Sequence, residues 1–217
     1  MCLPGIFRLS FVATLAFGFF VAPADATTIN FSGTVTSGTG SISNGDTLTG
    51  SLTYDETAVA RAGSDSQFAY FDAITAFSFS IGGFGSSLSN PTGASEIQID
   101  NNPGVPNHDR FAAISTVAGG FAPAQLDGVF DLNAFGFRVD DSTDTVFSDA
   151  LLLPTALSLA NFDSGSFFIF FKDSDNSIGG TIDSLETVSS IPLPAGLPLF
   201  ATGLAGLGLA TKRRKIS

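Results

Sequence analysis

Two short acidic segments hold the residues whose types and spacing most readily suggest chemistry. They are DDSTD and DSDN, and their candidate ligands are Asp140, Asp141, Asp144, Asp173 and Asp175. Calcium takes six to eight oxygen ligands from carboxylates and carbonyls, so each segment is a candidate calcium site. Neither follows the EF-hand pattern; in the second, Ile178 stands where glycine is required and Ser184 occupies the twelfth position. The alternative interpretation is that both segments are solvated acidic turns.

Groups suited to catalysis are sparse. The single histidine, His108, lies in NNPGVPNHDRF, where it is either a base or metal ligand acting with Asp109 or an exposed loop histidine. The chain has no G-x-S-x-G turn for a serine nucleophile. A glycosidase needs two carboxylates across a cleft, and no such pair stands out. The chain lacks tryptophan and offers only Tyr54 and Tyr70 for stacking on a sugar ring. We therefore expect no enzymatic activity and no cofactor other than calcium.

The elements that must position these residues are mostly strands. Apolar residues alternate with polar ones in DTLTGSLTY, AFSFSIGG, EIQID and AFGFRVDD, as strands with one buried face require. The expected inward residues are Leu48, Leu52, Tyr54, Phe77, Phe79, Ile81, Ile97, Ile99, Phe135, Phe137 and Val139. The run from Phe167 to Phe171 is apolar at every position, which predicts a central strand covered on both faces. Turn-rich segments separate these strands, so we expect an all-β fold, specifically a jelly-roll-like β-sandwich.

Composition and charge define the body of the chain. The 217 residues include 24 glycines and 23 phenylalanines, and residues 27–190 are expected to form one domain. This segment carries 19 acidic and 4 basic residues, a net charge of −15. So negative a surface repels nucleic acid and anionic lipid but tolerates cations and neutral sugars.

The N-terminus has the pattern of a secretory signal peptide, residues 1–26. Arg8 precedes the apolar segment Phe11 to Val21, and small residues follow around a cleavage site after Ala24 or Ala26. The secretory translocon and signal peptidase are therefore expected partners; an uncleaved membrane anchor is the alternative. The only cysteine, Cys2, would be lost with this peptide, leaving no disulfide and no thiolate site.

The C-terminal residues 191–217 combine prolines, an apolar run and a basic end. Residues 191–210 carry no charge and, as a helix, would extend about 30 Å, enough to cross one bilayer core. Prolines interrupt the first third, so we expect a single apolar helix from about Pro198. A basic membrane stop signal follows, formed by Lys212, Arg213, Arg214 and Lys215. This tail is either a sorting signal or a permanent anchor.

The order of these features resembles the C-terminal sorting signal called PEP-CTERM, in its VPLPA variant, which is found on exported proteins of Gram-negative bacteria. The expected sorting motif is Ile191, Pro192, Leu193, Pro194 and Ala195. The resemblance implies that exosortase, a membrane-embedded transpeptidase-like protease, recognises this motif and removes the tail. Ile191 replaces the usual valine, and Leu193 stands where the parent motif has glutamate, which leaves the exosortase subtype open.

The body, in segments such as FSGTVTSG and GDTLTGSLTYDETA, is similar to β-rich domains attached to this signal. The resemblance implies an exported surface or extracellular-matrix protein, held briefly at the inner membrane and associated with extracellular polysaccharide or biofilm. It offers no catalytic residues. The alternatives are a carbohydrate- or calcium-binding β-sandwich module, which would need exposed Tyr, Asn and Asp on a sheet face, and thirdly a surface hydrolase.

Overall fold

A computed structural model describes residues 26–60, 62–64, 67–88, 95–102, 108–172 and 175–188 of the chain. The expected apolar segment of the signal peptide, the sorting motif, the C-terminal helix and the basic stop signal lie outside these residues, as does Asp173. Within the described ranges the fold is all-β, as predicted. No helix in them has the length and apolar character needed to cross a membrane.

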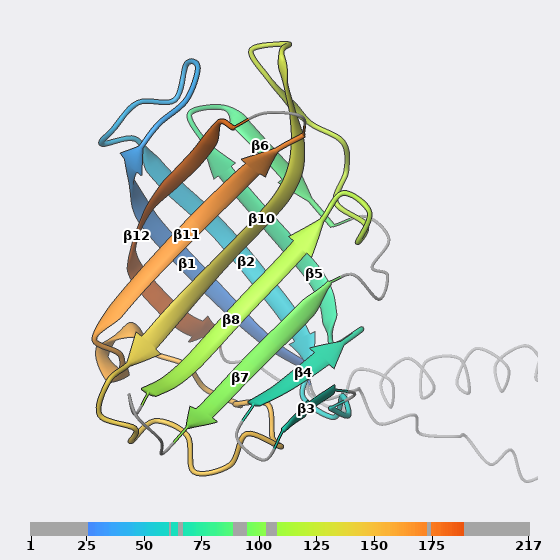
Figure 1. Cartoon of the computed structure of the whole chain (residues 1–217), viewed down its shortest axis with the longest axis vertical. Coiled ribbons are helices and arrows are strands. Elements are labelled where there is room, and N and C mark those ends of the chain that lie inside the picture. Colours follow the sequence, from blue (N-terminus) through green and yellow to red (C-terminus); the bar gives the residue numbers. More distant parts are fainter. Residues whose placement is uncertain are drawn as a thin grey trace, which may run out of the picture.

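In the described part of the chain, twelve strands form one antiparallel sheet (Figure 1). They are β1 (Ala26–Ser37), β2 (Thr47–Asp55), β3 (Ala62–Ser64), β4 (Gln67–Phe71), β5 (Ile74–Ile81), β6 (Phe84–Ser87), β7 (Glu96–Asn102), β8 (His108–Thr116), β9 (Gln125–Leu126), β10 (Phe130–Asp141), β11 (Ser164–Phe171) and β12 (Ser177–Val188). Their order is β3-β4-β7-β8-β10-β11-β12-β1-β2-β5-β6, with β9 paired to β10. A short 3₁₀ helix, η1 (Leu159–Asn161), precedes β11.

The sheet curls until its two halves face each other. Figure 1 shows β7, β8, β10 and β11 in one layer and β1, β2 and β5 behind it. Phe135 on β10 stacks on Phe79 of β5, with ring centroids 4.3 Å apart, and Phe137 lies 4.8 Å from Phe31 of β1. Because β11 and β12 separate β10 from β1 in the strand order, these contacts require the sheet to fold over. The core is therefore a cluster of phenylalanines between the two layers.

Alternation in the sequence correctly predicted which residues face this core. All eleven predicted inward residues are buried. The prediction for β11 is wrong on one side: Phe167, Ile169 and Phe171 face the core, but the side chain of Phe170 is 47% exposed and that of Phe168 is only partly buried. The inner face of β11 is thus covered, and its outer face presents aromatic rings.

Residues 142–163 close one end of the curled sheet, and we call this segment the end cap. Its Leu153, Leu157 and Phe162 are buried in the core. Two buried tyrosines hold its backbone: the hydroxyl of Tyr54 donates to the carbonyl of Pro154 at 2.5 Å, and that of Tyr70 donates to Ala150 at 2.5 Å. Both tyrosines are buried, Tyr54 as its alternation predicted, so neither ring is exposed for stacking on a sugar.

Candidate functional site

The predicted calcium ligands of the DDSTD segment point in different directions. Asp140 and Asp141 are neighbours in β10, so their side chains lie on opposite faces of the sheet. Asp144 belongs to the end cap and has a left-handed backbone, with φ 58°. Asp175 is exposed beside β12, at a separate place in the chain. Among the described residues, no three His, Cys, Asp or Glu side chains converge as a metal site. Calcium binding stays a prediction.

The carboxylate of Asp141 is fully occupied by its own loop. Its Oδ1 accepts hydrogen bonds from the backbone and hydroxyl of Thr143, and its Oδ2 accepts from the backbone and hydroxyl of Thr145. Burial raises the pKa of Asp141, but these donors outweigh burial and lower the pKa to about 2. Asp141 therefore acts as an anchor for the start of the end cap.

Asp109, like Asp141, is a buried carboxylate for which the sequence suggested a functional role. The His108–Asp109 pairing is not formed, because His108 faces the outer side of β8 and lies 3.7 Å from Asp100, whereas Asp109 faces inward. Oδ2 of Asp109 accepts hydrogen bonds from the backbone N–H groups of Val146 and Phe147, at 2.7 and 2.6 Å. Oδ1 has no hydrogen-bond donor among the described residues.

The outward side chains of β7, β8 and β10 form a charged row. The Nε of Arg110 lies 2.6 Å from Oδ1 of Asp140, and its Nη1 lies 3.6 Å from Asp100. On the same strand as Asp140, the Nε of Arg138 lies 3.4 Å from Oδ2 of that carboxylate. Arg138 is 51% exposed, so the rest of its guanidinium group is open to a ligand. The row brings two of the domain's four basic residues together.

A shallow depression beside this row, with a volume of about 170 Å³, is the candidate binding site. Its polar and aromatic lining consists of Glu96, Gln98, Arg110, Phe137, Arg138 and Phe168, and Ala112 also lines it. The ring of Phe168 packs beside that of Phe170, with centroids 5.1 Å apart. We call this region the outer-face site. It combines flat apolar rings with amide, carboxylate and guanidinium groups, which is the chemistry that polar ligands with a ring require.

The outer-face site was not predicted from the sequence. The unbroken apolar run from Phe167 to Phe171 predicted a strand buried on both faces, which would leave no aromatic ring exposed. One signal in the chain does point to it. Gly136 is the cross-strand partner of Phe168, and a Cβ at position 136 would lie 2.5 Å from Cζ of that ring. The glycine thus makes room for Phe168 to lie flat over the backbone of β10.

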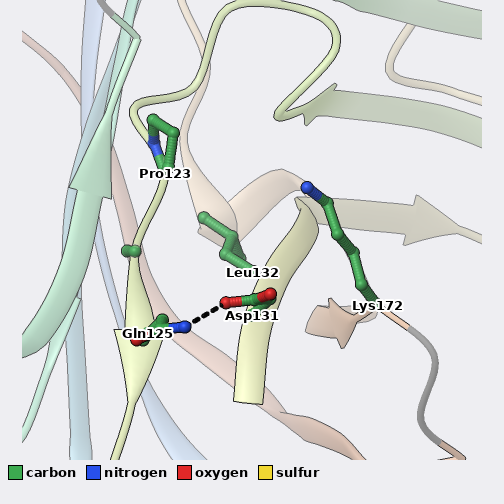
Figure 2. Close-up of a pocket in the computed structure, with 6 residues that line it drawn as sticks. Pro123, Gln125, Asp131, Leu132 and Lys172 are labelled. Atoms are coloured by element: carbon green, nitrogen blue, oxygen red, sulfur yellow. Dashed lines mark hydrogen bonds between the residues drawn. The ribbon is translucent and has the colours of Figure 1, made fainter. Parts of the chain in front are cut away.

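A larger pocket of about 430 Å³ lies at the opposite end of β10 from the end cap (Figure 2). Gln125 and Asp131 form one side, with Nε2 of the glutamine donating to Oδ1 of the aspartate at 2.6 Å, and Lys172 lines another side. Its lining contains one carboxylate and one ammonium group but neither a histidine nor a hydroxyl nucleophile. Asp131 and Lys172 are therefore the two titratable side chains that line this pocket.

The first and last described strands meet at the end-cap end of the domain. Thr28 near the start of β1 is the cross-strand partner of Val188, the last residue of β12. The end cap contacts both strands: the hydroxyl of Thr27 donates to the carbonyl of Thr155, and the N–H of Leu157 donates to the hydroxyl of Thr187. The chain therefore enters and leaves the domain at the same end.

Neither protein-family models, nor curated proteins, nor solved structures yield a match to this chain. The class defined by the fold and the sites is an acidic all-β domain with a phenylalanine core and an aromatic and charged patch on one outer face. Its first and last described strands meet at the capped end.

Proposed function

We propose that this chain is an exported, non-enzymatic surface or extracellular-matrix protein that exosortase sorts through residues 191–217. The order of the prolines, the apolar run and the basic end in residues 191–217 carries this proposal. The pairing of Thr28 with Val188 is the structural observation that agrees with it. It means that a leader ahead of β1 and a tail beyond β12 both join the domain at its capped end. After signal peptidase removes the leader, the domain would hang from the inner membrane by its tail alone, and the outer-face site would stay open to the surroundings.

The absence of enzymatic activity is part of the same proposal. It is supported by the separation of the candidate groups: His108 and Asp109 face opposite sides of β8, and both oxygens of Asp141 are occupied by threonine donors. A general base must reach the proton it removes, and a nucleophile must reach its base. A surface hydrolase is therefore the least supported of the three functions expected from sequence.

We also propose that the two facing layers make the domain a β-sandwich of jelly-roll type. Contacts between the layers support this: the ring of Phe77 on β5 lies 5.1 Å from that of Phe135 on β10, and Phe31 on β1 packs on Phe137. Sandwiches place their loops at the two ends and leave both outer faces free for binding.

The proposed sorting is tested by the intact mass of the protein isolated from its own host and from a strain without exosortase. We expect the chain to end near Ser190 only when exosortase is present. The same C-terminus, Ser217, in both strains would mean that the tail is a permanent anchor, and sorting by exosortase would be rejected.

A specific observation favours carbohydrate binding as a second function. The partly exposed ring of Phe168 lines the same depression as the half-exposed guanidinium of Arg138 and the amide of Gln98, and the exposed ring of Phe170 packs beside Phe168. A sugar ring could lie on Phe168 while its hydroxyl groups bind these polar groups. With a net charge of −15 over residues 27–190, the domain would favour a neutral polysaccharide over an anionic one.

Affinity electrophoresis tests this second function, with neutral and anionic polysaccharides embedded in separate gels. We expect the neutral polysaccharide to retard the wild-type chain and Phe168→Ala to remove the retardation. Leu152→Ala, which truncates an apolar side chain 67% exposed on the end cap, is the matched control and should migrate like the wild type. Equal retardation of both variants would exclude the outer-face site.

A further inference from the structure

We propose that signal peptidase cleaves the chain between Ala26 and Thr27, and that the α-ammonium group created on Thr27 binds the carboxylate of Glu56. This inference deepens the proposed function and rests on its export step, because only a processed chain carries an α-amino group at this position. It gives the cleavage a structural effect, since a charged group that the folded domain holds replaces the leader.

The cleavage position follows from where the domain begins. Ala24, Asp25 and Ala26 have the small-x-small pattern that signal peptidase recognises, and cleavage after Ala26 leaves Thr27 as the first residue. Thr27 is the first buried residue in the described part of the chain, with 3% of its surface exposed, and it pairs with Tyr54 of β2. A new terminus at Thr27 therefore lies within the sheet, whereas cleavage after Ala24 would leave two more residues ahead of it.

A pocket of about 400 Å³ lies beside the start of β1 at the capped end, and we call it the terminal pocket. It is lined by Ala26 and Thr27, by the last two residues of β12, by Thr155 and Ala156 of the end cap, and by Glu56, which follows β2. Among these described lining residues, Glu56 supplies the ionisable side chain. The start of β1 therefore adjoins open space next to one negative charge.

The hydroxyl of Thr27 has two acceptors but one proton to donate. It donates to Oε1 of Glu56, and the carbonyl oxygen of Thr155 lies 3.4 Å from it. A hydroxyl can donate to only one of these oxygens at a time. The backbone nitrogen of Thr27 is three covalent bonds away from the hydroxyl oxygen. As an ammonium group this nitrogen would carry three protons, so Glu56 and Thr155 could both receive a donor.

The charges around the terminal pocket favour a cation. The carboxylate of Asp55 is held by the N–H and hydroxyl of Thr57, which leaves Glu56 as the acceptor that faces the start of β1. Tyr54 is uncharged, because burial and Glu56 raise its pKa. On β12 the nearest charged side chain is the exposed Glu186, which is also acidic. The ion pairs of the described residues use basic groups on β8 and β10, and none of them includes Glu56.

The proposed pair should make stability depend on pH. An ordinary α-amino group has a pKa of about 7.7–8.0, and a neighbouring carboxylate favours the charged form, so the folded-state pKa of the Thr27 ammonium should be higher. A group whose folded-state pKa is raised contributes stability that is fully present below the unfolded value and is lost as pH rises through the folded value. The contribution of the pair should therefore be present at about pH 6.5 and absent at about pH 10.

The first measurement is the N-terminal residue of the protein isolated from its own host, read by mass spectrometry of the N-terminal peptide. We expect Thr27. A chain that begins at Asp25 would overturn the inference and leave export standing. A chain that still begins at Met1 would overturn the inference and would also reject removal of a signal peptide, so the two failures are distinct.

The second measurement is thermal melting of the processed chain with a free and with an acetylated α-amino group. Acetylation removes the charge and keeps every side chain. At about pH 6.5 we expect it to lower the melting temperature by about 2–4 °C, the scale of one charged hydrogen bond in a domain of this size. At about pH 10 the difference should disappear. Equal melting temperatures at the lower pH would overturn the inference.

Glu56→Gln identifies the partner of the ammonium group. In this variant acetylation should change the melting temperature by less than about 1 °C, because glutamine carries no charge to pair with. Glu186→Gln is the matched control, since it removes an exposed glutamate of β12 that does not line the terminal pocket, and it should keep the wild-type response. An equal response to acetylation in the wild type and in Glu56→Gln would show that Glu56 is not the partner, and the inference would fall.

Discussion

Gly136 on β10 lies directly opposite Phe168 on β11, and the phenylalanine ring covers the space that a side chain at position 136 would fill. A Cβ there would approach Cζ of Phe168 to 2.5 Å and the carbonyl oxygen of Ala113 to 2.9 Å. The outer-face site thus depends on a residue with no side chain.

We expect Gly136→Ala to displace the Phe168 ring and to lower the free energy of unfolding by about 1–3 kcal/mol, since the added methyl group overpacks the strand face. Urea denaturation followed by circular dichroism measures the change. Gly179→Ala is the control, because the nearest atom to a Cβ at that site is 3.7 Å away and the backbone is not left-handed. Equal losses in the two variants would contradict the role assigned to Gly136.

The phenylalanine core should carry much of the stability. Phe137 is fully buried between the layers and contacts Phe31 and Phe77, so Phe137→Ala should cost about 3–5 kcal/mol of unfolding free energy. Phe170→Ala makes the same truncation on the outer face of β11, where it should cost about 0.5 kcal/mol. Both values come from urea unfolding curves. A similar cost at the two sites would mean that the outer face of β11 is covered after all.

The two tyrosines should not ionise at their usual pH. Burial raises the pKa of Tyr70 to about 12, helped by the charge of Asp149, and burial with Glu56 raises the pKa of Tyr54 further. The chain contains no other tyrosine, so absorbance at 295 nm should show no step near pH 10. Because both folded-state pKa values are raised, this contribution to stability is present below about pH 10 and is lost as pH rises above it. A full phenolate step near pH 10 in the folded chain would contradict the tie between these tyrosines and the end cap.

Asp141 should make the fold sensitive to acid. Its folded-state pKa is lowered to about 2, so its contribution is present above the unfolded value of about 3.9 and is lost as pH falls from there through 2. In Asp141→Asn, the fall in melting temperature between pH 5 and pH 2 should be smaller than in the wild type. Asp175→Asn, which changes an exposed aspartate, should keep the wild-type slope. The prediction fails if both variants retain that slope.

The sequence was sufficient to predict the inward residues of β2, β5, β7 and β10, because side chains in a strand alternate with a fixed period of two. The local pattern of apolar residues could not predict whether the outer face of a strand is covered by another part of the chain. Phe168 and Phe170 belong to an unbroken apolar run, and only the position of β11 in the curled sheet leaves them on the outside.

The candidate sites depend on contacts between distant segments, which periodicity does not report. In the sequence Asp140 and Asp141 form one acidic cluster. In the structure both residues belong to β10, so their side chains lie on opposite faces of the sheet. Asp109 accepts hydrogen bonds from Val146 and Phe147 only because the end cap folds back over β8. The roles of Tyr54 and Tyr70 likewise require knowledge of where the cap lies.

The pairing of β12 with β1 along most of its length has a mechanical consequence. A force that pulls the chain beyond Val188 away from the domain acts along β12, nearly perpendicular to its hydrogen bonds with β1 and with the end of β11. These bonds must slip together and cannot open one after another. The last strand would therefore resist being pulled out, because its hydrogen bonds would be loaded in shear. A force applied to a ligand bound on the outer face would reach the tail without separating β12 from the sheet.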